Sequence, residues 1–446
     1  MESGAVSLSG APAQRVGFAD ALRVWLKIGC IGFGGPAGQI ALMHRVLVEE
    51  KRWVDEARYL HALNFCMLLP GPEAQKLATY VGWLLHGTRG GLAAGILFVL
   101  PGALVMLAMS LLYVLGRGVP AVDGALFGIK AAVLVIVVEA LIRIGRRSLK
   151  TGMLVGLAGL AFVGIFFLDL PFPLIVAAAA AIGYVVARSS PALVGLKPEG
   201  LAPVEPVAGR WRRAAAAAAT GLALWWAPIA LVVLALGPQH VLMDIGIFFS
   251  KLAVVSFGGA YALLAYMAQE AVEGYRWMSA PEMVDGLGLA ETLPGPLIKV
   301  TQFVGFLGAY RDAAPFSPVG AGVLGSLLTT WVTFAPPMLL IFACAPFVEQ
   351  LRSNRRISGA LAAITAAVVG VILNLTIWFA LHVLYARVEE ARAGPLRWYA
   401  FDPWTIDLWA CALALVAAVL AFRLRRGLVE LVLVMAGLGV AVRLLL

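Results

Sequence analysis

One tripeptide occurs twice in this chain, each time inside a long apolar segment: Pro70-Gly71-Pro72 and Pro294-Gly295-Pro296. Proline lacks a backbone donor, clashes with the preceding helical turn and pushes the residue before it out of the helical region. Each triplet is therefore predicted to break a membrane helix into two half-helices, the second beginning at the final proline. Backbone freed in this way is tolerated in a bilayer only where protein buries it or where it faces a water-filled cavity. Paired interruptions of this kind indicate a transporter's binding site.

The composition agrees with a membrane protein. The 446 residues are 61% hydrophobic, the mean hydropathy is +0.91, and long apolar runs recur, so we expect an all-α polytopic fold. The net charge of +9 does not indicate nucleic-acid binding, because the basic residues lie in short loops, where they orient a membrane protein. The cysteines and histidines have no metal-binding spacing, and nucleotide-binding and hydrolase motifs are absent. The sequence therefore predicts no metal, no cofactor and no enzymatic activity.

The two triplets belong to an internal repeat. They lie 224 residues apart (294 − 70), and two further signatures recur at the same separation. These are Phe33-Gly34-Gly35-Pro36 with Phe257-Gly258-Gly259, and Arg52-Trp53 with Arg276-Trp277. Several signatures in one register indicate a duplication. We therefore expect two homologous halves of about six helices each, residues 1–190 and 241–446. Residues 191–240 are expected to hold a polar linker and one extra transmembrane helix.

Charge in the loops predicts the orientation of the halves. If each broken segment crosses the membrane once, the chain makes about thirteen crossings, and the odd connecting helix inverts the second half. Four arginine-rich loops then lie on the cytoplasmic side with the N-terminus, as the positive-inside rule requires. They contain Arg143 to Lys150, Arg188 to Arg213, Arg352 to Arg356 and Arg423 to Arg426. Re-entrant triplets would move the last two outside, so full crossings are favoured. Arg45-Lys51-Arg52 and Arg387-Arg392-Arg397 remain exceptions that would lie outside.

An inverted repeat would point the half-helices that begin at Pro72 and Pro296 toward one shared cavity. A helix N-terminus offers free backbone donors and partial positive charge, which suits an anion. Lys76 and Lys299 would lie on the first turns and complete a site for a compact dianion, unless they snorkel to an interface. The glycines after Phe33 and Phe257 either line the site or pack helices closely. The predicted substrate-binding residues are Gly34, Gly35, Pro70, Gly71, Pro72, Lys76, Gly258, Gly259, Pro294, Gly295, Pro296 and Lys299.

Three carboxylates lie in apolar surroundings, where such groups often carry protons. They are Glu73, Glu139 and Glu291. Glu73 could instead cap the half-helix that begins at Pro72. Neither Glu139 nor Glu291 has an acidic counterpart in the other half, which would suit a proton-coupling site used by one half alone.

These motifs resemble the chromate ion transporters in their long, two-domain form. The resemblance rests on the three repeated signatures and on Gly82 and Gly90, and it covers nearly the whole chain. It implies a bacterial inner-membrane protein that exports chromate from the cytoplasm, confers chromate resistance and draws on the membrane potential or proton gradient. Its halves would be oppositely oriented. Ala260 replaces the proline that would follow the second Phe-Gly-Gly, so that motif is expected to kink less sharply.

The expected partners are chromate, protons and the lipid bilayer, with a homodimer as a further possibility. Chromate is a tetrahedral dianion close to sulfate in size and charge. Sulfate or another oxyanion, taken up or exchanged, therefore stays open as an alternative. A membrane enzyme acting on lipid phosphates is less favoured, because no acid/base or metal cluster is visible in the sequence.

Overall fold

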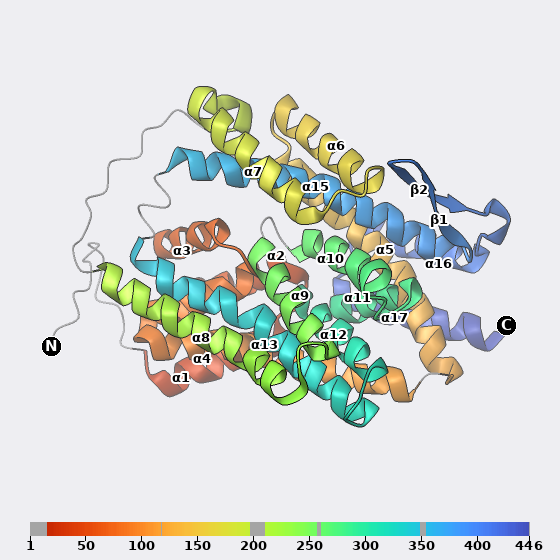
Figure 1. Ribbon diagram of the computed structural model, residues 1–446, viewed down its shortest axis with the longest axis horizontal. Helices are drawn as coiled ribbons and strands as arrows, with labels where there is room; N and C mark the ends of the chain where they lie inside the picture. Colours follow the sequence, from red (N-terminus) through yellow and green to blue (C-terminus); the bar gives the residue numbers. More distant parts are fainter. Residues whose placement is uncertain (1–15, 117, 197–209, 257–259, 348–353, 446) are drawn as a thin grey trace.

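The computed structural model describes residues 16–116, 118–196, 210–256, 260–347 and 354–445 (Figure 1). These residues are almost entirely helical, and seven helices are long and apolar enough to cross a membrane. They are α4 (Glu73–Leu115), α5 (Pro120–Ser148), α7 (Phe172–Ser189), α8 (Arg210–Leu236), α13 (Pro318–Cys344), α15 (Arg355–Leu384) and α17 (Leu428–Leu445). Two shorter apolar helices are α6 (Gly152–Phe166) and α16 (Leu408–Ala418), which a π turn, η7 (Val419–Arg423), extends. The prediction of an all-α polytopic membrane protein is confirmed.

The remaining short helices form four hairpins. In the first half these are α1 (Phe18–Ile31) with α2 (Gly35–His44), and α3 (Glu56–Leu68) with the start of α4. In the second half they are α9 (Val241–Val255) with α10 (Ala260–Gln269), and α11 (Ala280–Thr292) with α12 (Val300–Arg311). Short single-turn elements complete the set: η1 (Arg45–Glu50), η2 (Pro191–Val194), η3 (Glu270–Gly274), η4 (Leu297–Lys299), η5 (Ala345–Phe347) and η6 (Pro403–Thr405). In Figure 1 most of the hairpin helices lie between α7 and α15 above and α8 and α13 below, whereas α1 lies at the lower edge beside α4.

The expected straight crossing at each Pro-Gly-Pro triplet is wrong, because the chain turns back there. The rings of Phe65 and Tyr80 lie 5.1 Å apart on opposite sides of the first triplet. Across the second triplet, Arg311 and Glu282 form an ion pair at 2.7 Å. The physical reason is the glycine at the centre of each triplet. Its φ is +106° at Gly71 and +95° in the second copy, a left-handed conformation that reverses the chain instead of continuing it.

The first hairpin of each half also turns back. Phe248 in α9 and Tyr266 in α10 are 5.8 Å apart, ring to ring. In the first half, the start of α1 lies beside His86, which hydrogen-bonds the carbonyl of Val16 at 2.8 Å. The end of α2 returns to that same side, where His44 bonds Glu56 at the start of α3 at 2.6 Å.

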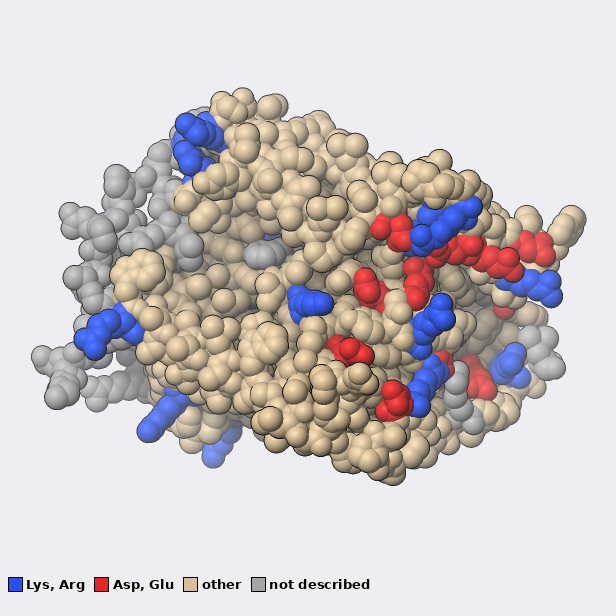
Figure 2. All heavy atoms as spheres, in the orientation of Figure 1, with Lys and Arg blue, Asp and Glu red and all other residues tan. Residues whose placement is uncertain are grey.

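The two halves are inverted relative to each other. The first-half hairpins open toward the turn at 86–87 and the end of α13, which we call the arginine-rich end. A Cβ on Gly91, just after that turn in α4, would lie 2.7 Å from Phe342 near the end of α13. The second-half hairpins open toward the opposite end, which carries the antiparallel strands β1 (Val388–Ala393) and β2 (Leu396–Phe401). We call this the strand end. On the face seen in Figure 2, acidic side chains gather toward the end where β1 and β2 lie.

Re-entrant hairpins change the helix count. Each hairpin leaves and returns at one end, so the broken segments add no crossing. Seven described helices are long and apolar enough to cross a membrane, and α6 and α16 are shorter. The loop with Arg45, Lys51 and Arg52 then lies at the arginine-rich end, so one exception to the charge rule disappears.

The Arg-Trp signatures have a backbone role in these hairpins. Arg52 and Arg276 both have positive φ, 52° and 55°. The amide of the following tryptophan closes the turn: Trp53 donates to Leu47 O at 2.9 Å, and Trp277 donates to Ala271 O at 2.8 Å. Each signature therefore ends a π turn in the left-handed conformation typical of a helix C-cap.

Candidate functional site

The breaks of the two halves are joined by two equivalent hydrogen bonds. The amide of Gly71 donates to Ser256 O at 2.9 Å, and the amide of Gly295 donates to Gly32 O at 2.9 Å. Each bond therefore connects a Pro-Gly-Pro triplet of one half with the residue just before Phe-Gly-Gly in the other half. The four breaks meet around a pseudo-two-fold axis.

Each triplet also packs against a proline-containing crossing helix of the other half. A Cβ on Gly71 would lie 2.4 Å from Cγ of Pro337 in α13. A Cβ on Gly102 in α4 would lie 2.5 Å from Pro294 O. The backbone freed by the triplets is thus buried in protein, one of the two situations that a membrane interior allows.

Lys76 and Lys299 are buried, each with 1% of its surface exposed. The ammonium of Lys76 donates to Leu69 O. The ammonium of Lys299 donates to Ala290 O at 2.8 Å, Leu293 O at 3.0 Å and Gly295 O at 3.3 Å. The last carbonyl groups of a helix have no donor within it, and a lysine near the end can supply one. Neither side chain snorkels to the surface, and both close the hairpin turn from which they extend.

Two glutamines near the triplets were missed by the sequence reasoning. Gln75 Nε2 donates to Phe334 O at 2.9 Å, and Gln302 Nε2 donates to Ala103 O at 3.0 Å. Both bonds run from a hairpin of one half to a crossing helix of the other. Each Oε1 atom is buried without a hydrogen-bond partner in the described part of the chain. The available signal was a polar residue buried in an apolar helix just after each triplet.

The three candidate carboxylates are not brought together. Glu291 is 5% exposed, and its Oε1 accepts a hydrogen bond from Tyr261 at 3.0 Å, which ties α11 to α10. Glu73 is partly exposed in the first turn of α4. Glu139 is exposed on α5 and pairs with Arg143 at 3.6 Å. Only Glu291 is buried.

Besides Glu291 and Glu282, which pairs with Arg311, α11 carries a third buried carboxylate, Asp285, that was also missed. Asp285 pairs with Lys130 of α5 at 2.9 Å and accepts a hydrogen bond from Tyr113 of α4 at 2.9 Å. These partners come from the first half, so the ion pair joins the halves. An acid inside an apolar helix was the signal that could have found it.

A cavity of about 640 Å³ is open to the surface beside the first Phe-Gly-Gly motif. Phe33 and Gly34 line it together with the start of α17, including Glu430, which pairs with Arg426 at 3.0 Å. Gly34 (φ +86°) and Gly35 (φ +64°) lead into α2, whose N-terminus has no side-chain cap. Gly258 and Gly259, the equivalent glycines, lie outside the described residues.

This arrangement offers an anion one kind of contact. Uncapped amides at a helix start bind anions readily, and the start of α2 lines the open cavity. The triplets Pro70 to Pro72 and Pro294 to Pro296 are packed by the other half and do not line this cavity.

The chromate transporter family model matches residues 19–184 and 243–442, once in each half. The chain belongs to the chromate transporter family. It is 34% identical over 380 residues to a chromate transport protein of Pseudomonas aeruginosa, covering 83% of this chain and 82% of that protein. It is 28% identical over 356 residues to a chromate transport protein of Cupriavidus metallidurans, covering 79% and 80%. An uncharacterized transporter of Methanocaldococcus jannaschii is 26% identical over 361 residues, covering 80% and 83%. No solved structure matches the chain.

Proposed function

We propose that this protein is a secondary transporter that exports chromate from the bacterial cytoplasm across the inner membrane. In this proposal the proton gradient or membrane potential drives it, and export confers chromate resistance. The observation that carries the proposal is the family match in both halves, supported by relatives named chromate transport protein. The inverted halves with paired breaks agree with it, because transporters of this design bind their substrate where the repeats meet.

The proposed oxyanion site begins at the N-terminus of α2. Gly34 lines the open cavity, so chromate reaching the cavity would meet the free amides there. Lys76 and Lys299 hold the hairpin turns and add positive charge near the breaks. In this mechanism the glycines and lysines predicted from the sequence act together: the glycine backbone contacts the anion, and the lysines fix the breaks.

Glu291 is the carboxylate that we propose for proton coupling. It is buried in α11, hydrogen-bonded to Tyr261 of α10, and has no acidic counterpart in the first half. A proton exchanged there would alter the contact between two hairpins of one half, which is a local change at a junction of movable elements.

Flux into proteoliposomes tests the proposal. Chromate and sulfate would be supplied separately, with and without an imposed pH gradient, to vesicles that contain the purified protein. We expect saturable chromate flux that the gradient accelerates. Sulfate flux with no chromate flux would assign the alternative oxyanion, and release of phosphate from the lipids would assign the enzyme.

A further inference from the structure

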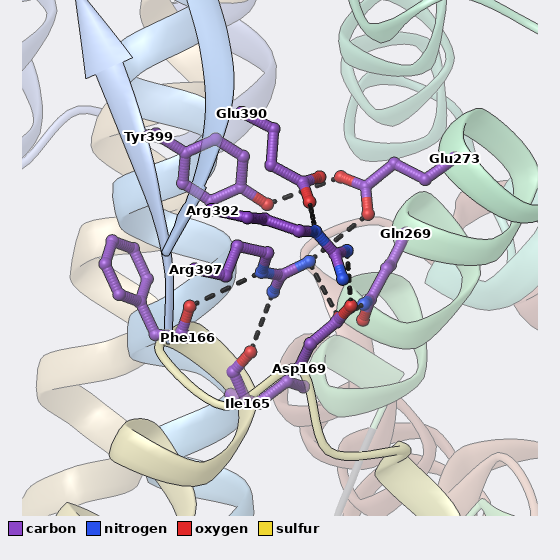
Figure 3. Close-up of polar contacts among 9 residues, drawn as sticks. All are labelled: Ile165, Phe166, Asp169, Gln269, Glu273, Glu390, Arg392, Arg397 and Tyr399. Atoms are coloured by element: carbon purple, nitrogen blue, oxygen red, sulfur yellow. Dashed lines mark hydrogen bonds and ion pairs between the residues drawn. The ribbon is translucent and has the colours of Figure 1, made fainter. Parts of the chain in front are cut away.

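A cluster of charged side chains joins both halves at the strand end (Figure 3). At its centre Arg397 of β2 is 1% exposed. Its guanidinium pairs with Asp169, in the turn between α6 and α7, at 2.8 Å and with Glu273 of η3 at 3.3 Å. It also donates to Ile165 O at 2.7 Å. One side chain therefore holds together a first-half turn, a second-half hairpin and the strands.

The cluster closes over a small cavity. Arg397, Glu273 and Ala268 line this cavity of about 10 Å³ together with Asn374, whose Oδ1 is buried without a hydrogen-bond partner among the described residues. That volume holds about one water molecule. The cavity beside Gly34 of α2 is about 640 Å³. Although α10 is the repeat equivalent of α2, the two cavities lie at different places along these helices: Gly34 at the start of α2 lines the large one, and Ala268 near the end of α10 lines the small one.

Acids outnumber bases within the cluster. Asp169, Glu273 and Glu390 face Arg392 and Arg397, and Arg392 binds both Glu390 and Asp169, at 2.6 Å for the latter (Figure 3). Charged or polar groups face Glu273 from every element packed against it. From the strands these are Glu390 and Arg392 of β1 and Arg397 and Tyr399 of β2, with His382 of α15 behind Tyr399. From the helices and turns they are Asp169 of the α6–α7 turn, Gln269 of α10 and Glu270 of η3 itself. One negative charge remains uncompensated among the five ionised side chains.

We propose that Glu273 binds the proton that controls this cluster: with the proton bound the strand end stays closed, and loss of the proton opens the small cavity. The proposal rests on the proposed proton-driven function and assigns a place at which the proton acts. A bound proton removes the excess negative charge. It leaves Arg397 paired with Asp169, so the contact between the halves survives.

The direction follows from the burial of Glu273, which lies outside the membrane-spanning helices. Burial, with Glu390 and Asp169 nearby, raises the pKa of the Glu273 carboxyl from 4.5 to about 7, although Arg397 and Tyr399 act in the opposite sense. In an opened cluster water would surround the carboxyl, and its pKa would return toward the ordinary value. A proton therefore binds the closed form more tightly. As the pH rises between these two pKa values, the closed form loses stability relative to the open form. The ratio of closed to open protein then falls on the order of a hundredfold.

Labelling of a cysteine in the small cavity tests the proposal. Ala268→Cys would be made in a chain whose four native cysteines are replaced, and the purified protein treated with a bulky water-soluble thiol reagent. At one pH above the range in which Glu273 titrates, we expect Glu273→Gln, which mimics the protonated acid, to slow labelling at least tenfold. Glu389→Gln, an exposed acid on β1, is the matched control and should change nothing. Equal rates with and without Glu273→Gln would overturn the proposal.

A pH series separates proton binding from a merely structural role. The labelling rate of Ala268→Cys, divided by that of the exposed Trp404→Cys, should rise with pH through neutrality and become flat in Glu273→Gln. An unchanged pH profile in Glu273→Gln would also overturn the proposal. Labelling needs no substrate, so absence of chromate flux would refute the proposed function and leave this result standing.

Discussion

The two buried lysines show how a single side chain can make a broken membrane helix possible. A triplet that reverses the chain leaves the preceding helix with carbonyl groups that no amide can reach. In hydrocarbon each unsatisfied group costs several kcal/mol. Lys299 donates to two carbonyls at that helix end, Ala290 O and Leu293 O, and to Gly295 O of the triplet. Lys76 donates to Leu69 O. An ammonium suits this task because it is compact and carries three donors.

Replacing each lysine by methionine should therefore destabilise the protein unequally. Methionine keeps roughly the length of lysine but has no donors, so each variant loses buried charged hydrogen bonds. Lys299→Met should lower the free energy of unfolding by roughly 3 kcal/mol, and Lys76→Met should lower it by less. Thermal unfolding of the purified variants measures this, with the exposed Lys150→Met as control. If both variants unfold like the parent while chromate binding falls, the lysines contact the anion and do not hold the turns.

A change at Gly34 tests the anion site without a change of size. Asp and Asn are nearly isosteric, and both tolerate the left-handed conformation of this residue. A carboxylate beside the free amides would repel a dianion, so Gly34→Asp should lower chromate uptake into vesicles about tenfold or more relative to Gly34→Asn. Equal uptake by the two variants would place the anion elsewhere.

At the scale of elements, the repeat was predictable and the hairpins were not. The common register of three signatures was enough to divide the chain into two halves. The triplets were correctly predicted to break helices, because that consequence of proline is local. The direction of the chain after each break depends on contacts from the other half, such as Ser256 O with the amide of Gly71. No local pattern encodes such a partner.

The candidate site, like the fold, was predictable only in part from the sequence. Lys76 and Lys299 were found because the repeat marks them, but their acceptors are carbonyls that become free only when the chain turns back. Asp285 and its partner Lys130 lie 155 residues apart (285 − 130) in different halves. Asp285 could have been noticed as an acid inside an apolar helix, but its contact with Lys130 depends on how the halves pack, so no local pattern predicts the pair.

The hairpin turn itself can be tested at its central glycine. In Gly71→Ala the new Cβ would lie 2.4 Å from Pro337, and the left-handed φ would add strain. We expect loss of more than about 3 kcal/mol of stability, from overpacking and strain together. Gly195→Ala is the matched control, because Gly195 is left-handed (φ 73°, ψ 16°) and a Cβ there would come no closer than 4.0 Å to another atom. It should cost only about 1 kcal/mol. Similar losses in both variants, measured by thermal unfolding, would mean that the contact with Pro337 does not matter.

For the whole molecule, re-entrant hairpins reconcile the fold with its charges. Arg45, Lys51 and Arg52 lie at the arginine-rich end, where the first-half hairpins open. Arg392 and Arg397 stay at the strand end, where they pair with Asp169, Glu273 and Glu390. By the positive-inside rule, we expect the arginine-rich end to face the cytoplasm. The described helices that are long and apolar enough to cross number seven, fewer than the thirteen expected. Since α1 begins beside His86 at the arginine-rich end and α17 ends near Gly124 at the start of α5, the two ends of the described chain still lie at opposite ends of the molecule.

Fusions at the C-terminus therefore cannot distinguish the two arrangements, but the hairpin loops can. Lys51 lies between the two first-half hairpins, and Gly274 lies between the two second-half hairpins. If each broken segment crossed the membrane, Lys51 would lie opposite Arg147, and Gly274 would lie on the side of Arg147. With re-entrant hairpins both assignments are exchanged. With an impermeant thiol reagent, we expect Lys51→Cys to be labelled only in inside-out vesicles, as Arg147→Cys should be. We expect Gly274→Cys to be labelled only in intact cells, as Trp404→Cys should be. Labelling of Lys51→Cys from outside intact cells would support the thirteen-crossing arrangement. In that case the substrate would have to reach the cavity beside Gly34 from the other side of the membrane.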